Sequence, residues 1–112
     1  MGFPKTERVL KREEFQRIYQ QGQKVQARYF TAFVLPTEDR QPRIGITVTR
    51  KFGKSVERNR ARRLLREVFR KNKWLVPHGV DIVINVKAAL SEADFRELES
   101  DFVTFLERVG NK

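Results

Sequence analysis

The residues with the clearest chemical signal lie between positions 50 and 73, where the sequence reads RKFGKSVERNRARRLLREVFRKNK. Seven arginines and four lysines stand there against two acids, Glu57 and Glu67, so this stretch carries +9 of the +10 net charge of the chain. A guanidinium group can bind phosphate through two hydrogen bonds at once and can stack on bases, whereas lysine acts as a point charge. Cations gathered on one element are typical of nucleic-acid binders. The stretch therefore predicts contacts to the phosphates of a nucleic acid.

Side chains that could catalyse hydrolysis are few. Such catalysis usually needs paired carboxylates, a histidine that exchanges protons, an activated nucleophile or a metal cluster. The one histidine, His78, follows Pro77 in an expected turn, where a surface role is favoured over catalysis. Asp81 could pair with an arginine or hold a hydrated magnesium ion, and pairing is the favoured interpretation. Solvation alone explains four other acids: Glu13, Glu14, Glu38 and Asp39. We therefore predict no catalytic residues and no metal ligands in this chain.

The basic stretch must be held by a helix with an apolar back. Its apolar residues recur at the spacing of a buried helical stripe: Ala61, Leu64, Leu65, Val68 and Phe69. At about 100° per residue, the residues that project nearly opposite this stripe are Asn59, Arg63, Arg66 and Arg70, with Arg60 and Arg62 on the flanks. Ser55 is the expected N-cap. A solvated charged face is the alternative, but such faces usually alternate in sign, and two acids are too few for that.

Two further helices and four strands are predicted around the basic helix. The expected helices span residues 12–21 and 91–109, and the expected strands span residues 24–27, 29–35, 43–50 and 80–87. The strands at 29–35 and 43–50 are expected to form a hairpin, because only a short polar turn separates them. This order of elements predicts an α/β fold, a two-layer sandwich with a mostly antiparallel sheet of about four strands and three helices.

The ends of the elements and the faces of the strands give further expectations. Gly22 is the expected stop of the first helix, and Ser91 with Asp94 resembles a capping box at the start of the last helix. The third expected strand has a small polar face made by Gly45, Thr47 and Thr49. Room above a sheet beside aromatic residues is what a single-stranded nucleic acid can use.

Length and composition fit one RNA-binding domain of residues 1–112, whose first ten residues are expected to form an extended arm. The chain has no cysteine, which excludes disulfides and Cys-based zinc sites. It has no apolar run of ~18 residues and no signal-peptide pattern. We therefore expect a soluble, cytoplasmic protein with no membrane partner, and no obligate protein partner is evident.

The segment VERNRARRLLREVF, residues 56–69, resembles the RNR motif of the bacterial ribonuclease P protein subunit. The similarity includes FQRIYQQG early in the chain, RIGITVTRKFG ahead of the motif and VDIVINVK after it, and so covers nearly the whole chain. The resemblance implies a fold like ribosomal protein S5 domain 2, with a left-handed β-α-β crossover where the general rule favours a right-handed one. It also implies that the chain joins a catalytic RNA, which removes the 5′ leader of precursor tRNA with magnesium ions. The endoribonuclease chemistry then belongs to the RNA.

The resemblance also implies roles for individual residues. The positions that match the contact surface for ribonuclease P RNA are Lys51, Lys54, Arg58, Asn59, Arg60, Arg62, Arg63 and Arg66. The positions that match the cleft for the single-stranded leader are Phe15, Tyr19 and Phe33. Phe15 and Tyr19 are also spaced like any buried helix stripe, so a pure core role stays open for these aromatics. Ser55 stands where alanine is common in the family, and we expect no loss of function from this difference.

Two other functions stay open from composition. One is a structural RNA-binding protein of ribosomal type, although such a protein has no need of a leader cleft with an aromatic first helix. The other is a DNA-binding helix, which would want Asn or Gln beside the arginines to contact bases. Asn59 alone is thin support for it. We therefore expect ribonuclease P RNA and precursor tRNA as the partners.

Overall fold

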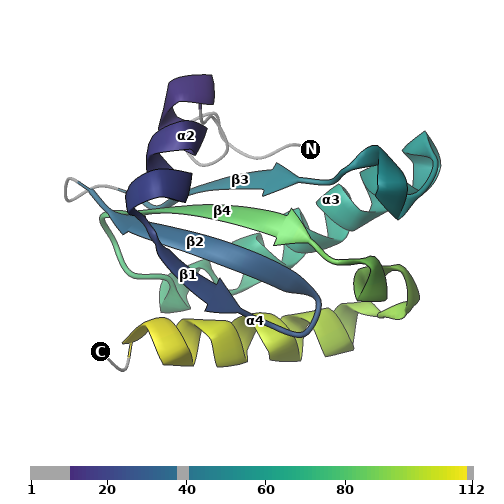
Figure 1. The fold of residues 1–112 in the computed structure, drawn as a ribbon. Helices are drawn as coiled ribbons and strands as arrows, with labels where there is room; N and C mark the ends of the chain where they lie inside the picture. Colours follow the sequence, from purple (N-terminus) through teal and green to yellow (C-terminus); the bar gives the residue numbers. More distant parts are fainter. Residues whose placement is uncertain (1–10, 38–40, 111–112) are drawn as a thin grey trace.

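The computed structural model of the chain describes residues 11–37 and 41–110 and arranges them as a four-stranded sheet with helices on both faces (Figure 1). The elements follow in the order α2 (Arg12–Gln21), β1 (Gln23–Gln26), β2 (Phe30–Pro36), β3 (Arg43–Thr47), α3 (Ser55–Lys71), β4 (Val80–Val86) and α4 (Phe95–Gly110), with 3₁₀ turns at Arg50–Phe52, Lys73–Leu75 and Ala88–Glu92. Helix α2 packs on β2 and β4 from one side, and α3 and α4 pack together on the other. The predicted α/β sandwich is confirmed, while the expected arm at residues 1–10 lies outside the described residues.

The strand order β1-β2-β4-β3 corrects the expected pairing. Strands β2 and β3 form no hairpin with each other, because β4 lies between them, antiparallel to β2 and parallel to β3. β4 is buried on both faces, since Val83 on one side and Ile82 and Ile84 on the other have almost no exposed surface. In the centre of the sheet, β4 has helices over both of these faces (Figure 1). The hairpin that does form joins β1 to β2.

The basic helix connects two parallel strands. In Figure 1, β3 and β4 point the same way, α3 returns behind the sheet, and β4 lies below β3, so the crossover is left-handed. The general preference is for the right-handed form. The family resemblance therefore predicted the hand correctly where the general rule did not.

The core lies between the sheet and the two helices behind it. Its largest side chains include Phe30 of β2, Phe69 of α3 and Phe102 and Phe105 of α4, all fully buried. Phe30 and Phe105 meet edge to face with ring centroids 5.5 Å apart, a favourable geometry for aromatic pairs. The predicted apolar stripe of the basic helix is confirmed, because four of its five residues are buried and Leu64 is partly buried against the same core.

Two helix starts differ from the expectation. Lys54, not Ser55, holds the N-cap position of α3, and its backbone N–H donates to Glu57 Oε1 at 3.0 Å. Helix α4 begins at Phe95 instead of Ser91, because Asp94 and Glu97 accept each other's backbone N–H at 2.9 and 3.0 Å. This reciprocal capping box satisfies two N–H groups at once.

Gly22 ends α2 at the expected place but for a different reason. Its φ of −75° and ψ of 158° are open to any residue, so it is not a left-handed helix stop. A Cβ atom built on Gly22 would lie 2.5 Å from the carbonyl oxygen of Ile18 and 3.1 Å from that of Val34. Glycine is needed there because the helix end approaches the backbone of β2 closely.

Replacing Gly22 with alanine should lower the free energy of unfolding by about 1–3 kcal/mol, because two stretches of backbone must move to make room. Urea denaturation of Gly22→Ala and of the wild type measures the difference. Gln21→Ala is the matched control, since Gln21 is the exposed residue before the glycine. A midpoint for Gly22→Ala as high as that of the control would contradict the close approach.

Candidate nucleic-acid interface

Helix α3 turns its cations away from the core. Asn59, Arg60 and Arg63 are exposed, as are Lys51 and Lys54 in the approach to the helix. Arg63 has no hydrogen bond or ion pair with any described residue. The buried stripe fixes the rotation of the helix about its own axis. The predicted outward projection of Arg63 is therefore confirmed.

Arg66 interacts with another residue of the protein, and four further arginines of α3 form hydrogen bonds or an ion pair. Arg58 Nη2 donates to Ser55 Oγ at 3.1 Å and Arg62 Nη1 donates to Asn59 Oδ1 at 3.2 Å. These partners are neutral, so both guanidinium groups keep an uncompensated charge and unused donors. Arg70 differs, because it forms an ion pair with Glu67 at 2.8 Å.

Arg60 is the fourth of these arginines, and its contact is structural. Its Nη2 donates to the carbonyl oxygen of Ala93 at 3.2 Å, which ties α3 to the segment before α4. This bond joins residues 33 positions apart, and sequence reasoning did not anticipate it. We call the remaining group the cationic face of α3, which consists of the exposed Asn59 and Arg63 and the half-buried Arg58, Arg62 and Arg66.

The opposite side of the sheet carries the aromatic residues. The rings of Tyr19 and Phe33 meet edge to face with centroids 4.9 Å apart. Tyr19 is 37% exposed and its hydroxyl donates to Asn85 Oδ1 at 2.7 Å. Phe15, one turn earlier in α2, is half-buried. The structure thus brings Tyr19 and Phe33 together next to solvent. We call Phe15, Tyr19 and Phe33 the aromatic surface.

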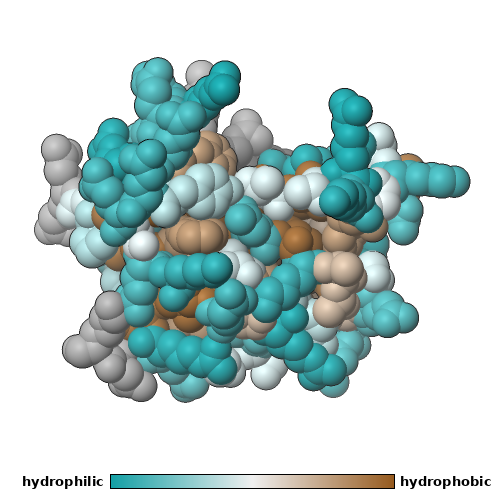
Figure 2. Space-filling view, in the orientation of Figure 1, coloured by the Kyte–Doolittle hydropathy of each residue, from teal (hydrophilic) through white to brown (hydrophobic). Residues whose placement is uncertain are grey.

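A row of polar side chains crosses the sheet next to the aromatic surface. The strand register places Thr31, Asn85 and Thr47 opposite one another on β2, β4 and β3. Thr31 Oγ1 donates to Gln26 Oε1 of β1 at 2.9 Å, which extends the row across all four strands. Figure 2 views this side of the molecule and shows apolar side chains near its centre with hydrophilic ones around them. Such a mixture suits the bases and the backbone of a single strand.

Asn85 is a polar residue that sequence reasoning missed. The alternation in residues 80–87 could have found it, because it places Asn85 on the same face as Asp81. Which residues lie beside Asn85 on the neighbouring strands depends on the pairing of distant segments. The alternation within one strand does not reveal that pairing.

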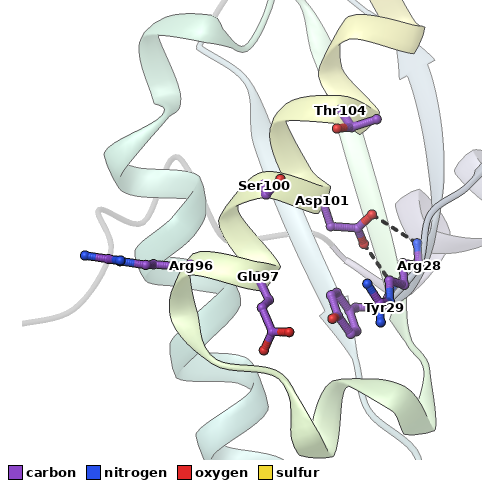
Figure 3. A pocket seen from close by; sticks show the side chains of 7 residues that line it. All are labelled: Arg28, Tyr29, Arg96, Glu97, Ser100, Asp101 and Thr104. Carbon is purple, nitrogen blue, oxygen red and sulfur yellow. Dashed lines mark hydrogen bonds between the residues drawn. The ribbon is translucent and has the colours of Figure 1, made fainter.

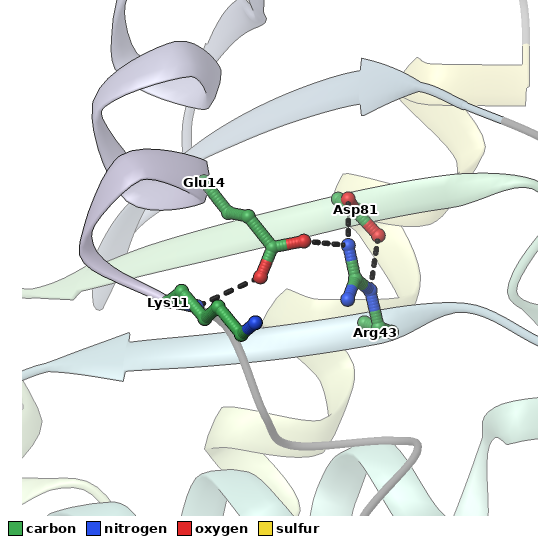
Figure 4. Close-up of polar contacts among 4 residues, drawn as sticks. All are labelled: Lys11, Glu14, Arg43 and Asp81. Carbon is green, nitrogen blue, oxygen red and sulfur yellow. Dashed lines mark hydrogen bonds and ion pairs between the residues drawn. The ribbon is translucent and has the colours of Figure 1, made fainter.

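Arg43 joins α2 to the sheet (Figure 4). Its Nε and Nη2 atoms donate to the two carboxylate oxygens of Asp81 at 3.1 and 2.8 Å, and Nη2 also lies 2.5 Å from Glu14 Oε2. Glu14 in turn accepts the backbone N–H of Lys11 at 2.8 Å. The predicted pairing of Asp81 with an arginine is confirmed, whereas solvation alone does not explain Glu14. We call Arg43, Glu14 and Asp81 the salt-bridge cluster.

The charges of the salt-bridge cluster stabilise one another. Partial burial raises the pKa of Glu14, but the hydrogen bonds from Lys11 and Arg43 and the charge of Arg43 outweigh it, so the pKa is lowered from 4.5. The hydrogen bond to Asp81 raises the pKa of Arg43. Because the Glu14 pKa is lower in the folded chain, its stabilising effect is present above pH 4.5 and is lost as the pH falls through the lowered pKa.

Two pockets lie outside the aromatic surface. One, of about 430 Å³, lies between α4 and the β1–β2 turn (Figure 3). There the carboxylate of Asp101 accepts the backbone N–H groups of Arg28 and Tyr29 at 3.1 and 2.8 Å, so it holds the turn in place. The other, of about 560 Å³, is bordered by Arg17, Arg43 and Thr37. Phe15, Tyr19 and Phe33 line neither of them, so a leader cleft beside these aromatics stays a prediction.

Further features bear on catalysis and on membranes. Within residues 11–37 and 41–110, no group of three or more His, Asp or Glu side chains could hold a metal ion. His78 is exposed, as expected for a turn. Of the helices in the described part of the chain, none has the length and apolar character to cross a bilayer.

Known proteins resemble this chain over almost its whole length. The family model described as Ribonuclease P matches residues 3–110. The ribonuclease P protein component of Geotalea uraniireducens is 40% identical over 110 residues, which cover 96% of this chain and 95% of that protein. The RNase P protein from Thermotoga maritima superposes with a TM-score of 0.83 at 36% identity, covering 91% of this chain and 96% of that one. A Staphylococcus aureus RNase P protein, a mutant with defective mRNA degradation activity, superposes with a TM-score of 0.86 at 29% identity. This match covers 95% of this chain and 90% of that one.

Proposed function

Because this chain belongs to the ribonuclease P protein family, we propose that the cationic face of α3 binds the RNA subunit and that the aromatic surface binds the leader of precursor tRNA. Members of the family are protein subunits of the ribonucleoprotein that processes the 5′ end of tRNA. The partners are therefore ribonuclease P RNA and precursor tRNA. In this proposal the RNA subunit cuts the phosphodiester bond, and the protein supplies binding surfaces on two sides of one sheet.

The observation that carries the RNA-binding assignment is the cationic face itself. Arg63 is exposed without an acidic partner among the described residues, and Arg58 and Arg62 are held by neutral groups. Unneutralised guanidinium groups on a rigid helix lose little entropy on binding phosphate and release counterions. Lys51 and Lys54 extend the charge ahead of the helix, while Arg60 contributes through its bond to Ala93.

The leader assignment depends on the exposure of the aromatic surface. Tyr19 and Phe33 are in contact but remain outside the fully buried core, and the polar row lies next to them. A base can stack on such a ring whatever its sequence. A core role for Phe33 is the alternative, and the Phe33→Ala variant tests it.

We assign magnesium to the RNA subunit. Glu14 and Asp81, the acids that share a site on the α2 side, are both bound to Arg43, so they are not available as metal ligands. The guanidinium of Arg43 beside the two carboxylates also disfavours a metal cation there. We further propose that residues 1–112 act as one RNA-binding domain in the cytoplasm.

Cleavage of precursor tRNA by a bacterial ribonuclease P RNA at low magnesium tests the proposed function. We expect added protein to raise the cleavage rate under these conditions. At a magnesium concentration that lets the RNA act alone, which is the control, we expect little further gain. If the protein gave no stimulation at low magnesium, a structural RNA-binding role of ribosomal type would be favoured instead.

Replacing Phe33 with alanine should weaken binding of leader-bearing precursor tRNA to the RNA–protein complex by about 1–3 kcal/mol, the contribution of one stacked base. Binding of mature tRNA should hardly change. Phe95→Ala is the matched control, because Phe95 is also half-buried but lies on the other side of the sheet. Equal losses for the two substrates with Phe33→Ala would indicate a core role for this ring.

A further inference from the structure

The chain presents its only tryptophan to solvent directly after α3. Trp74 is 80% exposed and lies in the 3₁₀ turn Lys73–Leu75. The backbone N–H groups of Leu75 and Val76 donate to the carbonyl oxygens of Asn72 and Lys73 at 2.9 and 3.0 Å. Asn72 and Val76, on either side of the turn, are buried. The indole is therefore held on a fixed turn and not on a loose loop.

The anchor of this turn reaches into both helices behind the sheet. Asn72 Nδ2 donates to the carbonyl oxygen of Val68 at 2.9 Å and to Glu99 Oε2 of α4 at 3.0 Å. An exposed turn of this geometry could carry any polar residue. A tryptophan exposes a large apolar ring there, and large exposed aromatics are enriched where proteins bind partners.

The sequence directly before Trp74 is cationic. Arg70, Lys71 and Lys73 precede it within four positions, and Glu67 is the only acid in the second half of α3. Trp74 thus continues the basic stretch at its C-terminal end. The helix of 17 residues is about 25 Å long at 1.5 Å per residue, so this end lies well beyond the contacts of Arg58 and Arg63. An aromatic ring among cations fits a base with its phosphate.

We propose that Trp74 stacks on an unpaired base of ribonuclease P RNA, at the end of α3 opposite the RNR motif. This inference rests on the proposed function, because it extends the surface that α3 offers to the same RNA. Lys71 and Lys73 lie next to the phosphates of the nucleotide in this arrangement. The contact gives the RNA–protein complex a second attachment point, which fixes the direction of α3 along the RNA.

A protein partner fits this surface less well. Trp74 and the 38% exposed Leu75 are the large apolar side chains of the turn, whereas stable protein interfaces bury roughly 1,200–2,000 Å² and are depleted of lysine. Two copies of the chain meeting at this turn would bring their cations together, which like-charge repulsion disfavours. An RNA nucleotide can stack its base on the indole ring and place its phosphate beside the cations.

Intrinsic fluorescence and binding affinity test this proposal together. Because Trp74 is the only tryptophan, its emission can be followed while ribonuclease P RNA is added to the full chain. We expect the emission to be quenched at saturation. Trp74→Ala should weaken binding roughly 5- to 100-fold without changing the slope of log K against log salt, since no phosphate contact is lost. Trp74→Phe should retain most of the affinity, and Leu75→Ala, the matched control, should stay within about 2-fold.

Several outcomes would overturn the stacking proposal while leaving the proposed function intact. The stacking proposal would be wrong if the emission stayed unchanged, or if Trp74→Ala bound the RNA as tightly as the wild type. The proposed function would stand in either case if Arg63→Ala still weakened binding. Quenching by precursor tRNA alone but not by ribonuclease P RNA would assign the ring to another RNA. Sedimentation that shows a dimer lost in Trp74→Ala would assign it to self-association. If the wild type failed to bind ribonuclease P RNA at all, the proposed function itself would fail.

Discussion

An Arg43→Ala variant should unfold with a free energy about 3–5 kcal/mol below that of the wild type, the loss expected when one partner of a buried ion pair is removed. The Asp81 side chain is only 4% exposed, so without the guanidinium its charge would lack a partner in a poorly hydrated place. Glu14 would lose the same partner, and α2 would lose an attachment to β3 and β4. Urea denaturation followed by circular dichroism measures the change.

Two variants separate this mechanism from a general effect of losing an arginine. Arg17→Ala removes an exposed arginine of α2 and should change stability by about 0.5 kcal/mol or less. The double variant Arg43→Met with Asp81→Leu should recover much of the loss, because it removes the buried charge along with its partner. If Arg43→Ala and Arg17→Ala unfolded at the same urea concentration, the salt-bridge cluster would contribute little.

The salt-bridge cluster also links stability to the proposed leader site. Glu14 lies one residue before Phe15, and Tyr19 follows one turn later on the same helix. The position of these rings over Phe33 therefore depends on how firmly α2 is held to the sheet. At temperatures where Arg43→Ala is still folded, we expect it to weaken binding of leader-bearing substrate more than that of mature tRNA.

The helices and strands could be predicted from the sequence because their signals are local. The period of apolar residues defines α3 and its buried side, and alternation defines β4. The strand order could not be predicted in the same way. Whether β3 pairs with β2 or with β4 depends on which strand needs cover on both faces, and that is a comparison between segments far apart in the chain. The mistaken hairpin of β2 with β3 came from weighting short connections above this need.

The candidate interface was predictable to a similar degree. The outward direction of Arg63 follows from helix geometry alone, and the structure bears it out. The bond from Arg60 to Ala93 and the contact of Tyr19 with Asn85 join residues 33 and 66 positions apart. Such contacts appear only once the fold has brought the segments together. The RNR motif therefore contains at least two kinds of residue, those that face outward and one that braces the fold.

Replacing both Arg63 and Arg66 with alanine should weaken binding of ribonuclease P RNA by about 2–4 kcal/mol, since each loses a charge-assisted bond to phosphate. The slope of log K against log salt should become shallower by about one unit for each lost contact. Arg63 is exposed whereas Arg66 is half-buried, so the single variants should differ, with Arg63→Ala accounting for the larger part. Filter binding or fluorescence titration at several potassium chloride concentrations measures both quantities.

The salt slope distinguishes a lost phosphate contact from a loss of structure. A variant that merely unfolds in part would lower the affinity at every salt concentration and would show a lower urea midpoint. Arg12→Ala is the matched control, because Arg12 is an exposed arginine in the first turn of α2, on the other side of the sheet from α3. We expect this control to leave the RNA affinity within about 2-fold. An unchanged slope for the double variant, at unchanged stability, would mean that phosphates are bound elsewhere on the chain and that the cationic face of α3 is only a solvated surface.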